Sequence, residues 1–469
     1  MNEGFIMEKR PLRTRFSPPL PSVFRYCSVL VLLLLLVGHA EGQAPAPLNQ
    51  SVIEPYYAFP ASSEAALVSF DWDSSGTLHY TVGDPNYGLK LEVYKLVGNT
   101  PVPVYQTTSA WPGSLLTCIG NHVYFNDGGD YTRGDFNYFF YIASNPESTT
   151  SLLEAPYAAS LWGITGRGPD EFFASGSIAT WGPAALFYSR LNGSGLLESV
   201  PPAVFGEVGD SPGPMAFDPF GNLYYVPGYA YSGTATIYRW NAQEVEAAVT
   251  GGADLQPAGR EWAALPAPYD GATGMIVDPY GNIYVTATSW GAPSQLIVFK
   301  SEEVSSIIAA EYEGRLETLR CRENGIYVSC ADGIFRMPLL QIAIPLEDET
   351  VEATFGDTVI FSVEASGGIG EKKYQWYRVD AQKSALPVGV NLPHYSLTAR
   401  REDSGARFYC TVSDAVYSVE SPHFLLTVQE PVPTATFPVV LFLGSALLLL
   451  GILVLIPGKG IVSKLKIRE

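Results

Sequence analysis

Asp218-Pro-Phe-Gly-Asn-Leu-Tyr-Tyr-Val226 is the stretch from which the fold is inferred. It returns sixty residues later as Asp278-Pro-Tyr-Gly-Asn-Ile-Tyr-Val285. In each copy Asp and Pro open a turn, Gly takes the positive-φ position, and an alternating apolar run begins a strand. The stretch therefore predicts a repeated unit made of a turn and a strand.

Weaker copies of this stretch lie on both sides of it. We align them on the apolar residue that follows each turn, which we call the anchor. Successive anchors are 45, 49, 51, 60 and 43 residues apart, and a second apolar strand follows five of them. Six sheet units of about 40–50 residues are typical of a β-propeller, because one such sheet cannot bury both of its faces alone. The anchors are Leu78, Val123, Phe172, Leu223, Ile283 and Ile326.

The last unit is short, and the strand-like residues 65–70 precede the first anchor. We therefore expect N-terminal and C-terminal strands to pair within one sheet. Residues 45–342 resemble six-bladed propellers of the NHL or SMP-30-like kind, in which the Asp-Pro-x-Gly-Asn stretch is frequent. The resemblance implies a fold and no particular activity, and the alternative architecture is an array of β-sandwiches.

Residues 343–429 follow a different pattern, which resembles an immunoglobulin-like β-sandwich. Trp376 lies on a central predicted strand, and Asp-Ser-Gly leads into a strand that carries Cys410. Val363 occupies the partner cysteine position and Phe408 the tyrosine-corner position, so the resemblance implies no inter-sheet disulfide. Both variants are similar to those of bacterial extracellular modules. The predicted core consists of Phe361, Val363, Trp376, Leu397, Phe408 and Cys410.

Residues 1–44 predict an export signal. Basic residues precede the apolar run Val29–Val37, and the small residues Gly38 and Ala40 suit cleavage before Glu41. The run is short for a membrane span. The alternative is an uncleaved anchor.

The other end of the chain predicts a membrane anchor. No charge occurs between Glu430 and Lys459, and the 18 mostly apolar residues Val439–Ile456 are long enough, at roughly 27 Å, to cross a bilayer. With an export signal in front, the ectodomain lies outside and the tail is cytoplasmic. The order of polar motif, apolar helix and basic tail resembles bacterial PEP-CTERM and IPTL-CTERM sorting signals, whose defining short motif is absent; the resemblance implies a bacterial cell membrane. We expect a linker over 430–437, a transmembrane helix over 438–457 and a basic tail over 458–469.

Composition and charge limit the function classes. The chain of 469 residues is 47% hydrophobic and 16% charged, with 45 Gly and 36 Pro, which favours a turn-rich all-β protein. Its net charge is −19, and residues 41–458 carry 19 basic and 44 acidic side chains, a net −25. Such a surface repels phosphate backbones, so nucleic-acid binding is excluded.

No catalytic, cofactor or metal motif stands out. The histidines lack a metal-binding spacing, and no Gly-x-Ser-x-Gly elbow is present. Asn126–Asp135 is the richest polar loop, and its acids make calcium the one ion considered; the alternative is a solvated connection. Cys321 and Cys330 flank Asn324-Gly325, and a two-residue turn there places them diagonally, so that a bridge requires a bulge or a longer loop. Cys118 is expected to be a free, buried thiol.

Aromatic residues in predicted loops are the candidate ligand contacts, namely Trp181, Tyr229, Tyr231 and Trp290. The alternative is that they fill the space between sheets. We expect an exported, membrane-anchored cell-surface protein whose propeller binds a protein or glycan and whose immunoglobulin-like domain is a spacer. The alternatives are a propeller hydrolase or lyase with a metal in its central channel, and a structural envelope component.

Overall fold

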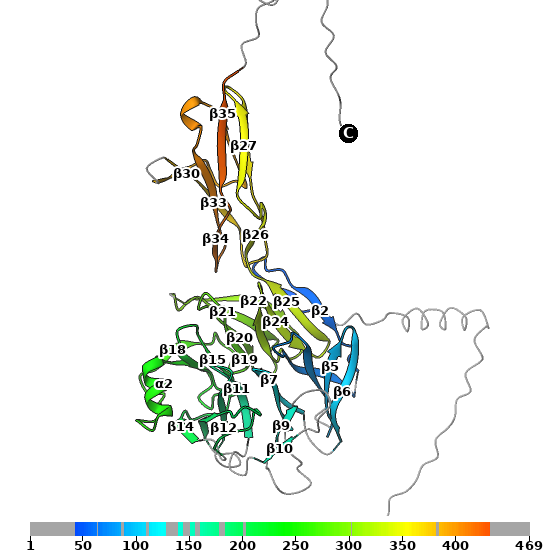
Figure 1. Ribbon diagram of the computed structural model, residues 1–469. Helices are drawn as coiled ribbons and strands as arrows, with labels where there is room; N and C mark the ends of the chain where they lie inside the picture. The colour runs from blue at the N-terminus through cyan, green and yellow to red at the C-terminus, as the bar shows by residue number, and fades with distance from the viewer. Residues whose placement is uncertain are drawn as a thin grey trace, which may run out of the picture. The chain divides into compact units, whose positions relative to one another are not determined.

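The structure is a computed structural model, drawn in Figure 1. It describes residues 43–431 except 63, 86–88, 109–111, 128–138, 144–150, 155–159, 178–182, 200–202, 302 and 381–383. The chain divides into two compact units. Unit 1 covers the residues up to 339 together with 367–370, and unit 2 covers 340–366 and the residues from 371 on.

Unit 1 is built from six antiparallel sheets, which we number in chain order. Sheet 1 consists of β3 (Ala66–Trp72), β4 (Leu78–Gly83), β5 (Leu91–Val97) and β6 (Thr100–Thr107). Sheet 2 consists of β7 (Pro112–Ile119), β8 (His122–Asp127), β9 (Phe139–Ala143) and β10 (Ser151–Glu154). Sheet 3 consists of β11 (Ser160–Thr165), β12 (Glu171–Ser177), β13 (Ala184–Arg190) and β14 (Ala203–Glu207). Sheet 4 consists of β15 (Met215–Phe217), β16 (Leu223–Tyr225), β17 (Thr236–Trp240) and β18 (Glu261–Ala264). Sheet 5 contains β19 (Gly271–Val277), β20 (Ile283–Thr288), β21 (Ser294–Phe299) and β22 (Ser306–Tyr312). Sheet 6 consists of β23 (Leu319–Arg322), β24 (Gly325–Cys330), β25 (Gly333–Pro338) and β2 (Glu54–Ala58).

The predicted anchors are confirmed as equivalent positions. Each one is the first or second residue of the second strand of its sheet, in β4, β8, β12, β16, β20 and β24. All six anchor side chains are buried. The apolar residue after the turn therefore marked the same structural position in every unit.

The first strands of the sheets contact one another in order. β3 contacts β7, β7 contacts β11, β11 contacts β15, β15 contacts β19, β19 contacts β23, and β24 of sheet 6 contacts β3 of sheet 1. In Figure 1, β7, β11, β15 and β19 lie toward the middle of unit 1, whereas β6, β10, β14 and β18 lie on its outside. The contacts thus lead from sheet 1 to sheet 6 and back to sheet 1.

Sheet 6 is completed by the beginning of the chain. β2 pairs with β25, with Glu54 opposite Arg336 and Ala58 opposite Gly333. The expected pairing of N-terminal and C-terminal strands is therefore confirmed, but the N-terminal strand is β2; the predicted strand at residues 65–70 corresponds to β3, which opens sheet 1. A further short strand, β1 (Ala46–Pro47), pairs with β22 and makes sheet 5 five-stranded.

Apolar side chains fill the space between neighbouring sheets. Trp72 of sheet 1 packs edge-on against Tyr327 of sheet 6, with ring centroids 4.8 Å apart. Phe173 of sheet 3 packs against Phe217 of sheet 4 at 4.8 Å in the same way. Burying such a ring contributes about 1.5–3 kcal/mol, so these contacts are a main source of the adhesion between sheets.

In the part of unit 1 that the structure describes, one α-helix interrupts the all-β pattern. α2 (Ala242–Val249) follows β17, and it accounts for the longest anchor spacing, from Leu223 to Ile283. Asn241 caps it: its side chain accepts a hydrogen bond from the Glu244 N–H, and the Glu244 carboxylate accepts one from the Asn241 N–H. This is the capping box that the residue pair Asn-x-x-Glu favours.

Unit 2 is also all-β. Its largest sheet has the order β27 (Glu349–Thr354), β35 (Phe424–Gln429), β33 (Arg407–Ser413), β30 (Lys373–Val379), β31 (Ala385–Val388), with β34 (Ser418–Glu420) beside β33. Two-stranded sheets pair β28 (Thr358–Ser362) with β32 (His394–Thr398) and β26 (Gln341–Ile344) with β29 (Glu364–Ser366), and a short 3-10 helix, η2, spans Arg401–Asp403.

The predicted core of unit 2 is largely confirmed. Phe361, Val363, Trp376, Phe408 and Cys410 are buried. Phe361 stacks on Phe408 at 4.7 Å, and the Trp376 indole donates a hydrogen bond to the Leu392 carbonyl at 3.0 Å. Leu397 is only half-buried, because its strand β32 pairs with β28 alone.

Both membrane-related predictions fall on residues that the structure leaves undescribed. Residues 1–42 of the predicted export signal and the predicted span 438–457 lie outside the described ranges. Within the described ranges, no helix has the length and apolar character needed to span a bilayer.

Candidate ligand-binding cavity

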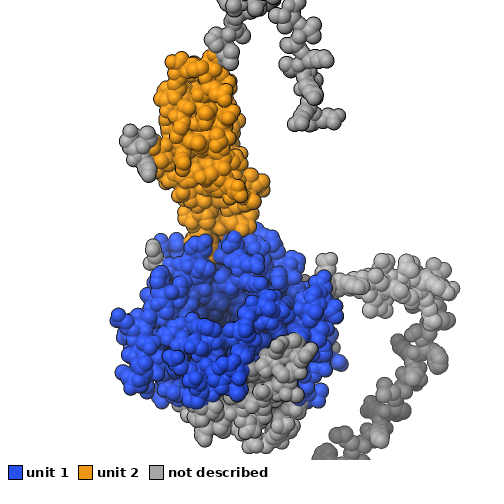
Figure 2. All heavy atoms as spheres, in the orientation of Figure 1, with its two compact units in different colours: residues 1–339, 367–370 blue, residues 340–366, 371–469 orange. Residues whose placement is uncertain are grey.

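A cavity of about 170 Å³ lies in unit 1, where the first strands of three sheets begin. Sheet 3 contributes β11, sheet 5 contributes β19, and sheet 4 contributes the segment before β15 together with Gly228, three residues past the end of β16. The segment before β23 supplies a charged residue. The lining includes Trp162, Pro212, Pro214, Gly228, Thr273 and Arg315. The face of unit 1 seen in Figure 2 is hollowed near its middle.

Two of these lining residues occupy β-bulges. The pairing of β11 with β12 skips Trp162, and the pairing of β19 with β20 skips Thr273. A bulge inserts one extra residue and redirects its side chain. The same irregularity in two sheets therefore presents an indole and a hydroxyl to the cavity.

Each bulge is followed by a glycine that the neighbouring sheet requires. A Cβ on Gly163 would lie 2.6 Å from the Gly213 carbonyl oxygen, and one on Gly274 would lie 2.5 Å from the Glu317 carbonyl oxygen. These distances are shorter than any real contact of a Cβ atom. The backbone of the next sheet consequently approaches to a distance that only glycine permits.

The same two carbonyls accept hydrogen bonds from buried hydroxyls. Ser175 donates to the Gly213 carbonyl, and Thr286 donates to the Glu317 carbonyl at 3.1 Å. Ser329 of sheet 6 repeats the contact with the Val68 carbonyl of sheet 1 at 2.8 Å. All three hydroxyls are fully buried and stand three residues after an anchor. Sequence analysis missed them, although a Ser or Thr at this offset in four of the six units was visible.

Arg315 and Glu317 supply the charge near the cavity. The Arg315 Nε lies 3.1 Å from the Glu317 Oε1. Burial raises the pKa of Glu317 above its usual value, and the Arg315 charge opposes that rise. Glu317 Oε2 is buried with no hydrogen-bond partner among the described residues. Glu317 therefore anchors the Arg315 guanidinium beside the cavity through its Nε atom.

The two Asp-Pro turns are structural. Asp218 accepts hydrogen bonds from the backbone N–H groups of Phe220 and Asn222, both at 2.9 Å, and from the Asn222 side chain at 2.7 Å. Asp278 makes the same three bonds in sheet 5, and both carboxylates are buried. Their acceptor capacity is used in fixing the turn.

Cys118 and Cys321 stand five residues before their anchors, as Asp218 and Asp278 do, but they do not occupy the same structural position. Cys118 pairs with its anchor Val123 across the hairpin, and Cys321 pairs with its anchor Ile326. In sheet 4 the residue that faces the anchor is Phe217, not Asp218. Sheets 2 and 6 have shorter turns, so counting back from the anchor does not reach the same position in every unit.

The hairpin of sheet 6 also differs from the expected register. Arg322 pairs with Gly325, so the turn residues are Glu323 and Asn324, and Cys321 faces Ile326 instead of Val328. Glu323 takes the positive-φ position, at 53°, while Gly325 lies within β24. Cys321 and Cys330 are free thiols, and burial raises the pKa of each to about 11.

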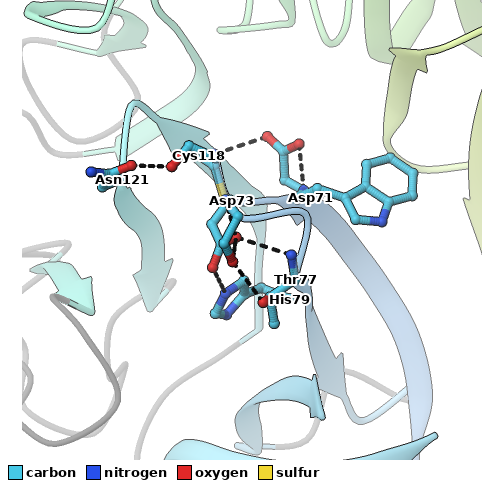
Figure 3. A network of polar contacts seen from close by, with 9 residues as sticks. Asp71, Asp73, Thr77, His79, Cys118 and Asn121 are labelled. Atoms are coloured by element: carbon cyan, nitrogen blue, oxygen red, sulfur yellow. Dashed lines mark hydrogen bonds and ion pairs between the residues drawn. The ribbon is translucent and has the colours of Figure 1, made fainter. Parts of the chain in front are cut away.

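A polar network joins the β3–β4 turn to sheet 2 (Figure 3). Asp73 accepts a hydrogen bond from the Thr77 N–H at 3.0 Å and lies 3.1 Å from His79 Nε2. Burial alone would raise the pKa of Asp73, but its hydrogen bonds from Ser75, His79 and Thr77 lower it below the usual value. The carboxylate of Asp73 is thus held ionised by the hydrogen bonds of its turn.

Cys118 belongs to the same network without being an activated nucleophile. Its backbone N–H donates to Asp71 at 2.8 Å. Burial and the Asp71 charge raise the pKa of its thiol far above the usual range. Because the thiolate is the reactive form, the sulfur near Asp73 and His79 is inert at neutral pH. It is a free thiol, as expected, and is partly rather than fully buried.

Three of the four predicted ligand contacts are described, and all three are exposed. Tyr229 and Tyr231 lie edge to face at 5.8 Å, and Trp290 is 98% exposed. Ala230 lies between the two tyrosines, and its N–H donates to the Asp270 carbonyl at 2.6 Å. The loop that carries Tyr229 and Tyr231 therefore lies beside the start of β19. Tyr229 directly follows Gly228 of the cavity lining. Trp181 lies outside the described residues.

The predicted polar loop also lies largely outside the described residues, from position 128 onward. Among the residues that are described, no group of three His, Cys, Asp or Glu side chains is arranged to hold a metal ion. The cavity lining has one charged residue, Arg315, which sequence analysis did not single out.

Comparisons with known proteins identify no family. No family model matches the chain, and no curated protein matches it. Among solved structures, it is similar to a puromycin-hydrolyzing peptidase of Mycobacterium tuberculosis (11% identity, 76% of this chain and 60% of that chain, TM-score 0.32). AtxE2 isopeptidase gives 11% identity, 79% and 59% coverage and a TM-score of 0.27. The four N-terminal Ig domains of Dscam1 isoform 1.9 give 11% identity over 81% of this chain and 79% of that chain, with a TM-score of 0.18.

The chain spans about three-fifths of the length of each of these two peptidases. Similarity at these TM-scores assigns neither fold nor activity.

Proposed function

We propose that this chain is an exported, membrane-anchored cell-surface protein that binds a protein or glycan ligand. Unit 1 is the binding domain, a six-bladed propeller whose blades are sheets 1 to 6. Unit 2 is an immunoglobulin-like spacer, and residues 438–457 are the membrane helix. The observation that carries the proposal is the cavity lined by Trp162 and Arg315, with exposed tyrosines beside it.

The order of contacts between sheets supports the propeller. Each first strand contacts the first strand of the next sheet, and β24 of sheet 6 contacts β3 of sheet 1. The β2–β25 pairing joins the two ends of the unit within one sheet, which is a common way to close such a ring. The equivalent bulges, glycines and hydroxyls of sheets 3 and 5 are expected if each sheet packs on its neighbour in the same way.

The chemistry of the lining supports ligand binding. A concave site with an aromatic wall and one charged group is the usual form of a small-molecule or chain-end site. Gly213 and Gly228 let two backbone segments of the wall pack closely: a Cβ on Gly228 would lie 2.4 Å from the Pro212 carbonyl oxygen, and the Gly228 N–H donates to the Ser211 carbonyl at 3.1 Å. A preformed wall lowers the entropy lost on binding.

Binding is tested with the full-length protein in detergent on glycan and peptide arrays. We expect Trp162→Ala to weaken binding of whichever ligand is found by about tenfold, since an aromatic contact contributes on the order of 1–2 kcal/mol. Phe220→Ala is the matched control, because this exposed ring lies in the turn at the far end of β15. Ligands whose affinity is unchanged by the Trp162 variant would place the binding surface elsewhere.

The proposed membrane topology is tested separately in intact cells. An impermeant amine reagent is expected to label lysines of the two units and to leave Lys464 unlabelled until the cells are opened. Labelling of Lys464 from outside would contradict the proposed topology.

A further inference from the structure

The geometry points to the C-terminal carboxylate of a peptide chain as the group that the cavity binds, with Arg315 as its partner and Trp162 against its last side chain. This inference rests on the proposed binding function and names its ligand class.

Arg315 is the one charged residue of the cavity lining. In the described part of the chain its ion-pair partner is Glu317, which is 3.1 Å from Nε. The two terminal nitrogens of the guanidinium are thus left for another partner, and the side chain is 47% exposed. Two parallel N–H groups of a guanidinium match the two oxygens of a carboxylate.

The cavity is small. Its volume of about 170 Å³ is below the roughly 300 Å³ at which sites for drug-sized molecules begin. It accommodates the end of a chain rather than an extended segment. A terminal carboxylate with one adjoining side chain fits this size.

Apart from Arg315, the lining consists of apolar side chains, glycine backbone and the two hydroxyl residues Ser211 and Thr273. Trp162, Pro212, Pro214 and Ala272 line the cavity, and the Thr273 hydroxyl already donates to the Leu316 carbonyl at 2.6 Å. The apolar groups offer contact area to an apolar side chain, and Ser211 and Arg315 are the lining side chains left to hydrogen-bond a ligand. A free sugar with many hydroxyls would leave most of them unpaired here, at a cost.

The charge of the chain distinguishes a peptide from an acidic polymer. Residues 41–458 carry a net −25, which repels a polyanion such as a polyuronate. A neutral or basic peptide brings one negative group, at its end, to the one cation of the cavity. Tyr229, which follows Gly228, lies where the preceding residues of such a peptide would leave the cavity.

The inference is tested by calorimetric titration of the full-length protein in detergent. The ligands are N-acetylated Gly-Lys-X tripeptides with X as Ala, Val, Leu or Phe, each prepared as the free acid and as the C-terminal amide. We expect at least one acid to bind about tenfold or more tightly than its amide, because only the acid forms the charge-assisted pair. Arg315→Gln is expected to remove the difference between acid and amide.

Arg260→Gln is the matched control. Arg260 is 42% exposed and pairs with Glu244, so the variant removes the same kind of ion pair outside the cavity lining. It should leave the preference for the acid unchanged. If Arg315→Gln unfolds because it leaves Glu317 unpaired, the double variant with Glu317→Gln removes both charges and should lose the preference while remaining folded.

Equal binding of acid and amide, or no binding of any acid at 1–10 mM (on the order of the weakest measurable affinities), overturns the inference. So does a preference for the acid that survives in the double variant. An oligoglucuronate that binds where no peptide does also overturns it, but leaves the proposed binding function standing if Trp162→Ala weakens that binding. Loss of the inference and loss of the proposed function therefore give different results.

Discussion

Arg320 of sheet 6 lies 2.8 Å from Asp71 of sheet 1, measured from Nε to Oδ2. The same carboxylate oxygen accepts hydrogen bonds from the backbone N–H of Cys118 at 2.8 Å and from the Thr117 hydroxyl at 3.2 Å, both in sheet 2. One carboxylate therefore connects three sheets, and both charged side chains are mostly buried.

Asp71→Ala is expected to reduce the free energy of unfolding by about 3 kcal/mol. The variant leaves the Arg320 charge and the Cys118 N–H without their partner, and removing one member of a largely buried pair is costly. Urea denaturation measures the change. Asp170→Ala is the control, since its pair with Arg190 is exposed and spans 3.8 Å; its effect should stay within about 0.5 kcal/mol.

Thr286→Val is expected to cost about 1–2 kcal/mol. Valine keeps the shape but removes the hydroxyl that donates to the Glu317 carbonyl, which then lies buried with one partner fewer. Thermal unfolding of this variant is compared with that of Thr100→Val, an exposed threonine in β6. Equal melting temperatures for the two variants would show that the hydroxyl between sheets does not contribute to stability.

Asp218→Ala is expected to destabilise the protein by about 2 kcal/mol and to leave ligand affinity unchanged. Three hydrogen bonds to the carboxylate are lost, two of them from backbone N–H groups of the turn. Phe220→Ala in the same turn removes only an exposed ring and serves as the control. A variant that folds normally but no longer binds would identify Asp218 as a residue needed for ligand binding.

Glu317→Gln is expected to become more stabilising, relative to the unchanged chain, as the pH rises. Burial raises the folded-state pKa of Glu317 above its unfolded value near 4.5. The protonated acid is therefore favoured in the folded state, and its contribution is present below pH 4.5 and lost as the pH rises through the folded pKa. Glutamine does not titrate. Denaturation at pH 4 and at pH 7 compares the two proteins, and a pH-independent difference contradicts the assignment.

The anchors and the sheets were predictable because they depend on local chemistry. A turn residue followed by an alternating apolar run is specified within about eight positions, and it identified the second strand in all six sheets. The completion of sheet 6 by the start of the chain followed from counting strands. In unit 2, Trp376 and Phe408 were placed correctly because both lie on strands with clear alternation.

The cavity was not predictable in the same way. Trp162 and Thr273 line it because each is the extra residue of a bulge, and a bulge depends on the pairing of two strands and on the approach of a third sheet. Arg315 stands in a connection with no distinctive pattern. The register error at Cys321 had a local cause: Asn-Gly favours a turn with Gly inside it, but Glu323 took the positive-φ position instead.

The pairing of β2 with β25 has a consequence for the time course of folding. Glu54 meets Arg336 only after the 281 residues between them have been synthesised, and until then β2 has no strand with which to pair. Contacts between residues so distant along a chain form late and slowly. The unfinished unit exposes a free strand edge during this interval, which is the geometry that recruits other chains into aggregates. The order in which the first and last strands are made thus sets the length of time for which this strand edge stays unpaired.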